Sequence, residues 1–281
     1  MQSRKALLSV AIFLTALSVT NVGKTSEINI ASASNFGGTL QALVDTFTKA
    51  TLVDRKNFNI ILASTGKHTA QINRGAPIDI FLSADLIGSN LHPSLTVSES
   101  EFTYAIGVLS LVSRHALSNL PFDNPPRDKQ ARSKPDRDTL SKPIAQPELS
   151  QSIDCLAIAN PRVAPYGQAG LIAAESLKHS GIRVKRLVQG QSIAQAFQFF
   201  HTGACNSAFV AKAQVISLLH EKNDTFNSVD VPQSFHQPIQ QNAILLKRAA
   251  DKVIALKFLE YLKSDEARKI IRAAGYLTDI Q

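Results

Sequence analysis

The residues best suited to chemistry in this sequence are small and hydroxyl side chains that directly follow predicted strands and precede predicted helices. They recur at four junctions: residues 31–35 (ASASN), 63–66 (ASTG), 160–167 (NPRVAPYG) and 190–193 (GQSI). A helix start presents amide N–H groups without intrahelical acceptors, and the helix dipole adds partial positive charge there. Each junction could therefore bind an anion, with added hydroxyl donors from Ser34, Thr65 and Ser192. A single serine of this kind is usually only an N-cap, but four such junctions favour an anion site.

The sequence lacks the common catalytic motifs. It contains no G-x-S-x-G, H-E-x-x-H or C-x-x-C motif, and no G-x-G-x-x-G follows a predicted strand. The seven histidines are scattered without metal-ligand spacing. Residues 64–67 resemble part of a phosphate-binding loop, but Ile61 stands where that loop needs glycine, and His68 stands where it needs Ser or Thr. Nucleotide hydrolysis is therefore disfavoured.

Short β patterns alternate with helical patterns along the chain. The predicted strands are Ile28–Ala33, Phe58–Ala63, Ile78–Ser83, Tyr104–Ser113, Leu156–Ala159, Val184–Val188, Ala208–Ala211 and Ala243–Lys247. After the first strand, Phe36, Leu40, Leu43 and Phe47 recur at helical spacing. This alternation predicts an α/β protein of two lobes, each a mainly parallel sheet flanked by helices. Ligands of such folds bind at the carboxyl ends of strands, where the four junctions lie.

One segment differs in composition from the rest of the chain. Residues 118–152 contain six of the 12 prolines together with many Arg, Lys and Asp residues, which predicts a mobile loop. The segment divides the chain near its middle. A solvated insertion without function and a docking site both remain open for it.

The N-terminus predicts export. Arg4 and Lys5 precede a largely apolar run, Ala6–Val19, and a polar stretch follows, which is the pattern of a secretory signal peptide over residues 1–23. The run is short for a membrane span, and a buried N-terminal helix is the alternative. The rest of the 281-residue chain, 44% hydrophobic and 19% charged overall, has the composition of a globular protein and excludes collagen-like order and general disorder. We therefore expect a soluble protein outside the cytoplasm.

The net charge and the two cysteines leave alternatives open. The formal charge is +8, or +6 once residues 1–23 are removed, which fits nucleic acid, an anionic membrane, an anionic ligand or simple solubility. Export argues against nucleic acid. Cys155 and Cys205 each precede a short predicted strand and would lie in an oxidising compartment. Both a disulfide and two buried thiols are consistent with this pattern.

Several motifs at their relative spacing resemble one family. They are ASASNF at 31–36, ASTGKHTAQI at 63–72, RGAPIDIFLSAD at 74–85, AIANPRVAPYGQAG at 157–170, QGQSIAQAF at 189–197, FVAKAQV at 209–215 and RAAGY at 272–276. On these motifs the chain resembles the periplasmic molybdate-binding proteins of ABC-type uptake transporters. The resemblance runs from Glu27 to the C-terminus, except for residues 118–152, which are longer than usual for the family.

The resemblance implies a two-lobed periplasmic-binding-protein fold of type II. Residues 24–106 and 239–281 would form lobe 1 and residues 107–238 lobe 2, with two hinge crossings near Tyr104–Ser110 and Pro232–Ala243. The lobes would close over molybdate or tungstate and deliver it to an ABC permease in the membrane. The implied protein is a monomer without enzymatic activity, nucleic-acid partner or cofactor, and it holds metal only as the oxyanion.

The resemblance places oxyanion binding on six residues: Ser34, Asn35, Ser64, Thr65, Tyr166 and Ile193. Ser34 and Thr65 would donate hydroxyl groups, with Asn35 and Ser64 beside them, and the family's backbone donors fall on the other two residues. Ala211 stands where some members carry a tyrosine, so the Tyr166 hydroxyl could substitute for that group. Threonine at 65, where serine is usual, adds a methyl group to the pocket.

The charged residues near the junctions have a smaller expected role. A doubly charged oxyanion can be held by neutral N–H and O–H donors alone, without a buried cation. Lys67 and Arg162 are expected to face solvent and to steer anions. Asp79 and Asp85 would repel an anion, so we interpret them as structural. Sulfate, thiosulfate or an organic acid remains the alternative ligand on the same fold, and an enzyme on this scaffold is a third hypothesis.

Overall fold

The computed structural model describes residues 27–85, 91–116, 118, 120–123, 152–219 and 225–279. The predicted signal peptide, residues 1–23, lies outside these residues, as does most of the proline-rich segment 118–152. Within the described residues, no helix is long and apolar enough to cross a membrane.

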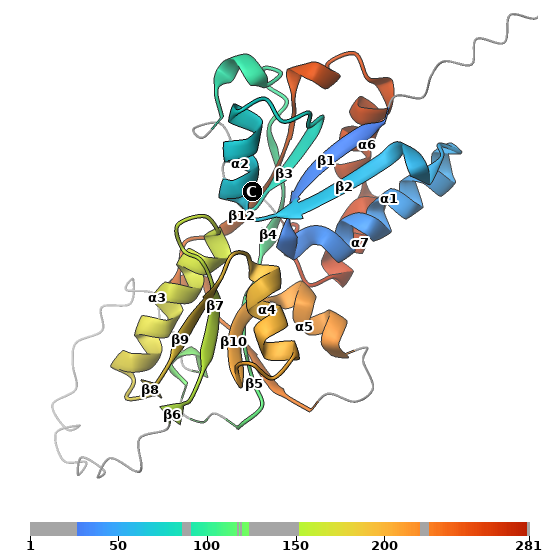
Figure 1. Ribbon diagram of the computed structural model, residues 1–281. Coiled ribbons are helices and arrows are strands. Elements are labelled where there is room, and N and C mark those ends of the chain that lie inside the picture. Colours follow the sequence, from blue (N-terminus) through green and yellow to red (C-terminus); the bar gives the residue numbers. More distant parts are fainter. Residues whose placement is uncertain are drawn as a thin grey trace, which may run out of the picture.

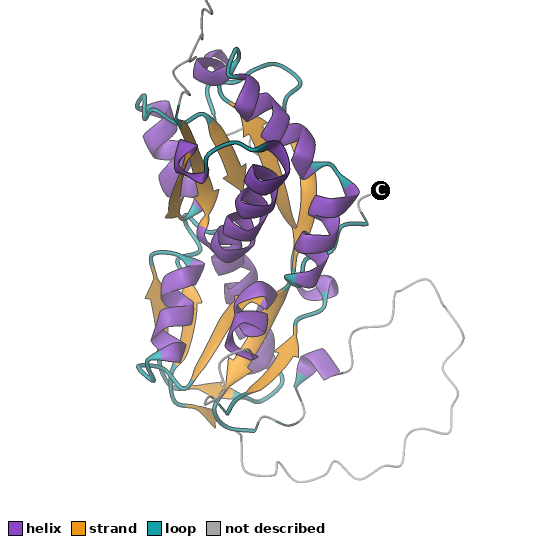
Figure 2. Cartoon of the chain, turned by 90° about the vertical axis from the view of Figure 1, so that its right-hand side faces the viewer, coloured by secondary structure: helices purple, strands orange, loops and turns teal. Residues whose placement is uncertain are grey.

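The chain forms two lobes, each built on a five-stranded sheet with helices packed against it (Figures 1 and 2). The first lobe contains β1 (Ile28–Ala33), β2 (Phe58–Ala63), β3 (Ile80–Ser83), β4 (Phe102–Gly107), β12 (Ile239–Leu245), α1 (Gly37–Thr51), α2 (Thr65–Asn73), α6 (Val253–Leu262) and α7 (Asp265–Ala273). A single 3-10 turn, Ser34–Phe36, connects β1 to α1. The two-lobed α/β architecture predicted from the sequence is confirmed.

The second lobe has the same layered plan (Figure 1). It contains β5 (Leu109–Ser113), β7 (Leu156–Ala159), β9 (Leu187–Gly190), β10 (Ser207–Ala211), β11 (Asn227–Asp230), α3 (Pro165–His179), α4 (Ile193–His201) and α5 (Lys212–Leu219). A separate small sheet pairs β6 (Ser152–Ile153) with β8 (Arg183–Val184).

Both sheets are mixed, and their parallel strands are the ones that lead into the junctions. The strand order is β2-β1-β3-β12-β4 in the first lobe and β11-β5-β10-β7-β9 in the second. In the first sheet β2, β1 and β3 are parallel, whereas β12 runs antiparallel to both of its neighbours. In the second sheet β10, β7 and β9 are parallel, and β5 is antiparallel to β10 and β11. The predicted parallel arrangement therefore holds for three strands of each sheet.

Two of the predicted strands are each divided between two sheets. The apolar run Tyr104–Ser113 breaks at Val108, because β4 pairs with β12 in the first lobe while β5 pairs with β10 and β11 in the second. The predicted strand Val184–Val188 divides in the same way into β8 and β9. A continuous apolar pattern carries no information about which neighbour each half will find, so these two predictions were wrong.

Each lobe has its own apolar core. In the first lobe, the predicted helical stripe Phe36, Leu40, Leu43 and Phe47 is buried against the sheet and against α6, including Phe258. This confirms the amphipathic pattern that follows β1. Helix α3 of the second lobe begins at Pro165, and proline is well suited to the first helical position.

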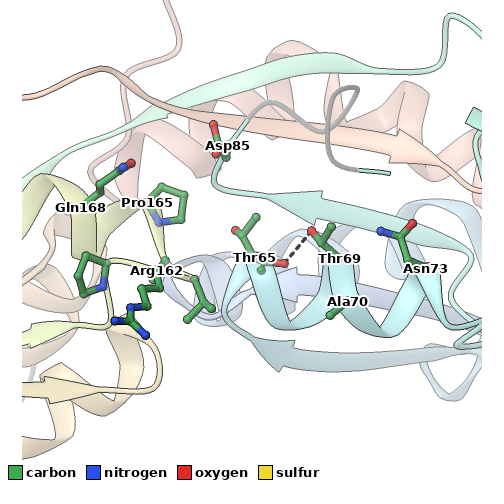
Figure 3. A pocket seen from close by; sticks show the side chains of 12 residues that line it. Thr65, Thr69, Ala70, Asn73, Asp85, Arg162, Pro165 and Gln168 are labelled. Carbon is green, nitrogen blue, oxygen red and sulfur yellow. Dashed lines mark hydrogen bonds between the residues drawn. The ribbon is translucent and has the colours of Figure 1, made fainter. Parts of the chain in front are cut away.

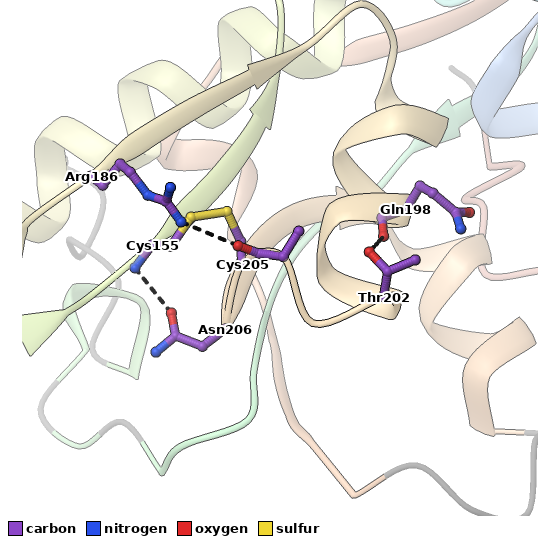
Figure 4. Close-up of a disulfide and its surroundings, with 7 residues drawn as sticks. Cys155, Arg186, Gln198, Thr202, Cys205 and Asn206 are labelled. Atoms are coloured by element: carbon purple, nitrogen blue, oxygen red, sulfur yellow. Dashed lines mark hydrogen bonds between the residues drawn. A yellow bond between two sulfur atoms is a disulfide. The ribbon is translucent and has the colours of Figure 1, made fainter.

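A disulfide between Cys155 and Cys205 links two segments of the second lobe (Figure 4). The neighbouring strands β7 and β10 pair directly beside it, through Ser207 and Leu156. The Cys155 amide also donates to the Asn206 side chain at 3.1 Å. Of the two readings left open by the sequence, the bridge is the one found in the structure.

Candidate functional site

The strand registers bring the four junctions together as two pairs. Ala33, the last residue of β1, pairs with Ala63, the last residue of β2, so the segments that follow them start side by side. Likewise Ala159 at the end of β7 pairs with Gly190 at the end of β9. The two pairs of strand ends face one another between the lobes (Figure 1). The expected clustering at the carboxyl ends of parallel strands is thus present.

The Ser34 junction meets the second lobe directly. The Ser34 hydroxyl accepts a hydrogen bond from the Ala194 amide, 3.4 Å away, in the first turn of α4. Next to it Asn35 is buried, and its side-chain amide donates to Gln241 and Tyr276. The hydroxyl of Ser34 therefore lies at the boundary between the lobes, whereas the Asn35 side chain is bound within the first lobe.

The β2–α2 junction carries two hydroxyl groups with different surroundings. Thr65 begins α2, and its Oγ1 accepts from the Ala84 amide at 3.1 Å. Ser64 is the N-cap residue; it is buried, and its Oγ has no hydrogen-bond partner among the described residues. Ser64 is thus the hydroxyl whose donor and acceptor capacity is wholly uncommitted, although the sequence favoured Thr65 as the donor.

The second lobe contributes helix starts. Tyr166 is the second residue of α3 and Ile193 the first residue of α4, so their amide N–H groups lie where a helix offers no internal acceptor. Both residues are buried. Helix α3 starts so close to the end of β7 that a side chain at Gly167 would collide with the Ala159 carbonyl. Ser192 caps α4 by accepting from the Gln195 amide at 3.3 Å, which leaves its hydroxyl in the ordinary N-cap role.

The two lobes touch beside these junctions. The Gly66 amide, in the first turn of α2, donates to the Val163 carbonyl of the second lobe at 2.9 Å. Together with the contact between Ser34 and Ala194, this bond holds the facing strand ends in contact. The structure is therefore a closed arrangement in which the strand ends that lead into the predicted donors of the two lobes face one another.

The geometry has a counterpart in known proteins. The family model for bacterial extracellular solute-binding proteins matches residues 28–277. This chain belongs to that family. Among the relatives of this solute-binding protein, the molybdate-binding protein ModA of Rhodobacter capsulatus is 34% identical over 257 residues, covering 90% of this chain and 89% of the relative. ModA of Azotobacter vinelandii is 32% identical over 261 residues, covering 90% of each chain.

A solved structure agrees with the sequence relatives. The periplasmic molybdate-binding protein of Azotobacter vinelandii matches this solute-binding protein with a TM-score of 0.66 and 30% identity, covering 89% of this chain and 99% of that chain. The resemblance to molybdate-binding proteins and the fold that it implies are confirmed.

Two cavities lie at the boundary between the lobes of the solute-binding protein. One, of about 470 Å³, separates Thr65 and Thr69 of α2 from Arg162 and Gln168 of the second lobe (Figure 3). The other, of about 490 Å³, is lined by residues of both lobes that include Ser34. Both flank the direct contacts described above and give solvent access to the boundary.

The charged residues near the site differ in position. Lys67 and Arg162 are both exposed, and Arg162 lines the first of these cavities. Asp79 is fully buried, and its carboxylate pairs with Arg248 and Lys252, both at 2.9 Å. This confirms the structural interpretation of Asp79. Among the described residues, no group of three His, Cys, Asp or Glu side chains is placed to hold a metal ion.

The Tyr166 hydroxyl lies beside the connection between the lobes. A side chain at Gly107, the last residue of β4, would collide with it. Burial raises the pKa of Tyr166 well above its usual range, and the nearby Tyr276 and Tyr104 add to this shift. The phenol is therefore neutral and remains available as a hydrogen-bond donor.

Sequence reasoning missed the residues that organise the site without touching its centre. Gly66 lies within the motif at 63–72, but nothing in that motif predicts its contact with the second lobe. Gln241 and Tyr276 were not predicted at all as part of the site. Their roles depend on which strands pair, and no local pattern reports that.

Proposed function

We propose that this protein captures molybdate or tungstate outside the cytoplasm by closing its lobes over the anion, and delivers it to an ABC permease. In this proposal it acts as a monomer without cofactor, releases its ligand chemically unchanged and binds no nucleic acid. The two ModA relatives named above are molybdate-binding proteins, and each matches this chain over nearly its whole length. This similarity supports molybdate as the ligand.

The observation that supports the proposal is that strand ends leading into neutral donors face one another from both lobes. The Ser34 hydroxyl reaches the first turn of α4, where the Ile193 amide also lies. Ser64 and Thr65, which both carry hydroxyls, are the N-cap and the first residue of helix α2. A dianion between the lobes would replace its hydration shell by these O–H groups and by amide N–H groups, including those of Asn35 and Tyr166.

Such a site selects by protonation and by size. Phosphate carries a proton at neutral pH, and in a site of amide N–H and hydroxyl groups only a hydroxyl oxygen can accept it, so phosphate should bind more weakly than a fully deprotonated anion. Molybdate and tungstate are fully deprotonated tetrahedral anions of similar size. Sulfate is smaller, so the same donors would hold it at longer distances and therefore more weakly.

Thermal unfolding of the mature protein, stripped of anions, tests the ligand. A ligand at about 1,000 times its Kd adds about 4 kcal/mol to the free energy of unfolding, which shifts the Tm by several degrees. We expect micromolar molybdate and tungstate to give this shift, and sulfate and phosphate to give none at the same concentration. Stabilisation by sulfate alone, or by none of the four, would overturn the proposed ligand.

Removal of single hydroxyls tests the site. Ser34→Ala and Thr65→Ala should each weaken molybdate binding by about 1–3 kcal/mol, the usual range for a lost donor to a charged group. Thr65→Ala also removes the acceptor of the Ala84 amide and should lower stability, whereas Ser34→Ala should act mainly on affinity. Ser264→Ala is the control, because Ser264 caps α7 by accepting from the Ala267 amide. Unchanged affinity in both site variants would show that the anion binds elsewhere.

A further inference from the structure

A buried network of polar side chains lies behind the Ser34 junction. Asn35, Gln241 and Tyr276 are 4%, 0% and 3% exposed. Asn35 Nδ2 donates to Gln241 Oε1 at 2.8 Å and to the Tyr276 hydroxyl at 3.1 Å. The Tyr276 hydroxyl donates in turn to the Asn35 carbonyl at 2.9 Å. More than 200 residues of sequence separate Asn35 from either partner.

The orientation of every group in this network is fixed. Gln241 Nε2 donates to the Ile239 carbonyl at 3.1 Å, so the Gln241 oxygen must face Asn35. The single Tyr276 proton is given to the Asn35 carbonyl, so Tyr276 can only accept from the Asn35 amide. Both N–H groups of the Asn35 side chain are thereby used. Its remaining atom, Oδ1, is an acceptor that would repel an oxyanion.

We propose that Gln241 and Tyr276 are positioning residues that hold the turn Ser34–Phe36 in the conformation able to bind the anion, and that they connect this turn to the hinge. The proposal rests on the proposed function, since it concerns how the same site is organised. Asn35 then contributes its backbone N–H to the anion and uses its side chain to fix the turn.

Both positioning residues are anchored on the strand that leads into the second lobe. Gln241 pairs with Ala105 of β4, and the pairing register shifts between Gln241 and Asn242. Leu277, which follows Tyr276, exchanges two backbone hydrogen bonds with Ile106 of β4, at 2.8 and 3.0 Å. Two independent attachments therefore tie the Asn35 turn to β4.

The network ends where the two lobes connect. Gly107 closes β4, and a Cβ at this position would collide with the Tyr166 hydroxyl of the second lobe and lie 3.1 Å from Gln241 Nε2. The Tyr166 hydroxyl is buried without a hydrogen-bond partner in the described part of the chain. A change in the angle between the lobes moves Tyr166 against Gly107 and Gln241, and thus acts on the Asn35 turn.

The tyrosines in this region supply a spectroscopic signal. The protein has four tyrosines and no tryptophan. Tyr276 and Tyr104 both pack on Phe36, with ring centroids 5.4 and 4.9 Å apart, and Tyr166 lies at the adjoining hinge. The fourth, Tyr261, packs on Phe47 and Phe258 in the first lobe. Closure over an anion should therefore change the tyrosine fluorescence through the three residues near the hinge.

Two variants test the proposal in the full mature protein with molybdate as the probe. Tyr276→Phe keeps the ring and removes the hydroxyl, and Gln241→Leu keeps the volume and removes both hydrogen bonds. We expect each to weaken the molybdate Kd about tenfold, the effect of one or two lost hydrogen bonds. Tyr261→Phe, which removes a tyrosine hydroxyl away from the network, should retain the wild-type Kd and the fluorescence response.

A double mutant separates positioning from general stability. If Tyr276 acts through the Ser34 turn, Tyr276→Phe should increase the molybdate Kd by a smaller factor in the Ser34→Ala variant than in the wild-type protein. The proposal would be overturned if the losses of binding free energy from the two substitutions were additive. It would also be overturned if Tyr276→Phe and Gln241→Leu lowered the Tm while their Kd stayed within twofold of the Kd of Tyr261→Phe. If wild-type protein itself binds neither molybdate nor tungstate, the proposed function fails first, and the positioning role falls with it.

Discussion

Replacement of Gly66 by alanine should weaken anion binding and, at the same time, raise the stability of the anion-free protein. Gly66 donates its amide to the Val163 carbonyl across the lobes at 2.9 Å. An added Cβ would lie 3.1 Å from the Val163 Cα and Cβ and 3.2 Å from its oxygen. The two segments must then move apart by a few tenths of an ångström in the closed form. With the lobes apart, as expected without anion, these contacts with Val163 are absent.

The magnitude follows from these contacts. A weakened hydrogen bond and mild overpacking cost about 1 kcal/mol each, so closure becomes about 2 kcal/mol less favourable. Because 1.4 kcal/mol corresponds to about tenfold in Kd, molybdate should bind about 30-fold more weakly. The free energy of unfolding of the anion-free protein should instead rise by about 0.5–1 kcal/mol, because alanine stabilises a helix more than glycine does.

Gly38→Ala is a matched control. Gly38 is also the second residue of an α-helix in the first lobe, and a Cβ there meets nothing within 4 Å. It should raise the free energy of unfolding without changing Kd. Calorimetric titration with molybdate and denaturant unfolding without anion measure both quantities for both variants. Equal Kd values for Gly66→Ala and Gly38→Ala would refute the inference that the lobes meet at Gly66 in the anion-bound state.

Two further predictions concern the free energy of unfolding. Cys155→Ser with Cys205→Ser opens a loop closed across 50 residues, so the free energy of unfolding should fall by about 4 kcal/mol. Kd should not change, because the bridge lies at the far end of β7 from the junction; a weakened Kd in calorimetry would contradict this. Burial lowers the pKa of His68, whose Nε2 contacts the Ser32 carbonyl at 3.1 Å, so the unfolded chain takes up a proton first. Stability should therefore fall as the pH drops below about 6.5, and His68→Gln should lose that part of the slope in denaturant titrations; an unchanged slope would contradict it.

The elements that the sequence predicted well are those specified by local pattern. The stripe from Phe36 to Phe47 has helical spacing, and its residues are buried. The ends of β1, β2 and β7 coincide with the predicted ends at Ala33, Ala63 and Ala159. These positions are set by side-chain alternation and by the small residues that begin each helix, both of which can be read from a few neighbouring residues.

What the sequence could not supply depends on partners distant in the chain. Val108 separates β4 from β5 because the two strands find different sheets, although the residues around it form one apolar run. Asn35 was predicted beside the anion, but the use of its side-chain amide depends on Gln241 and Tyr276, more than 200 residues away. Such pairings leave no mark on local periodicity.

Closure links the size of the anion to the contacts between the lobes. The Gly66 amide reaches Val163, and the Ala194 amide reaches Ser34, only when the facing strand ends are close. An anion larger than the enclosed space would hold the lobes apart and break both bonds. A smaller anion would allow the bonds but leave the fixed donors at longer distances. Affinity should therefore peak at one anion radius, because the contacts between lobes and the contacts to the anion reach their best geometry together.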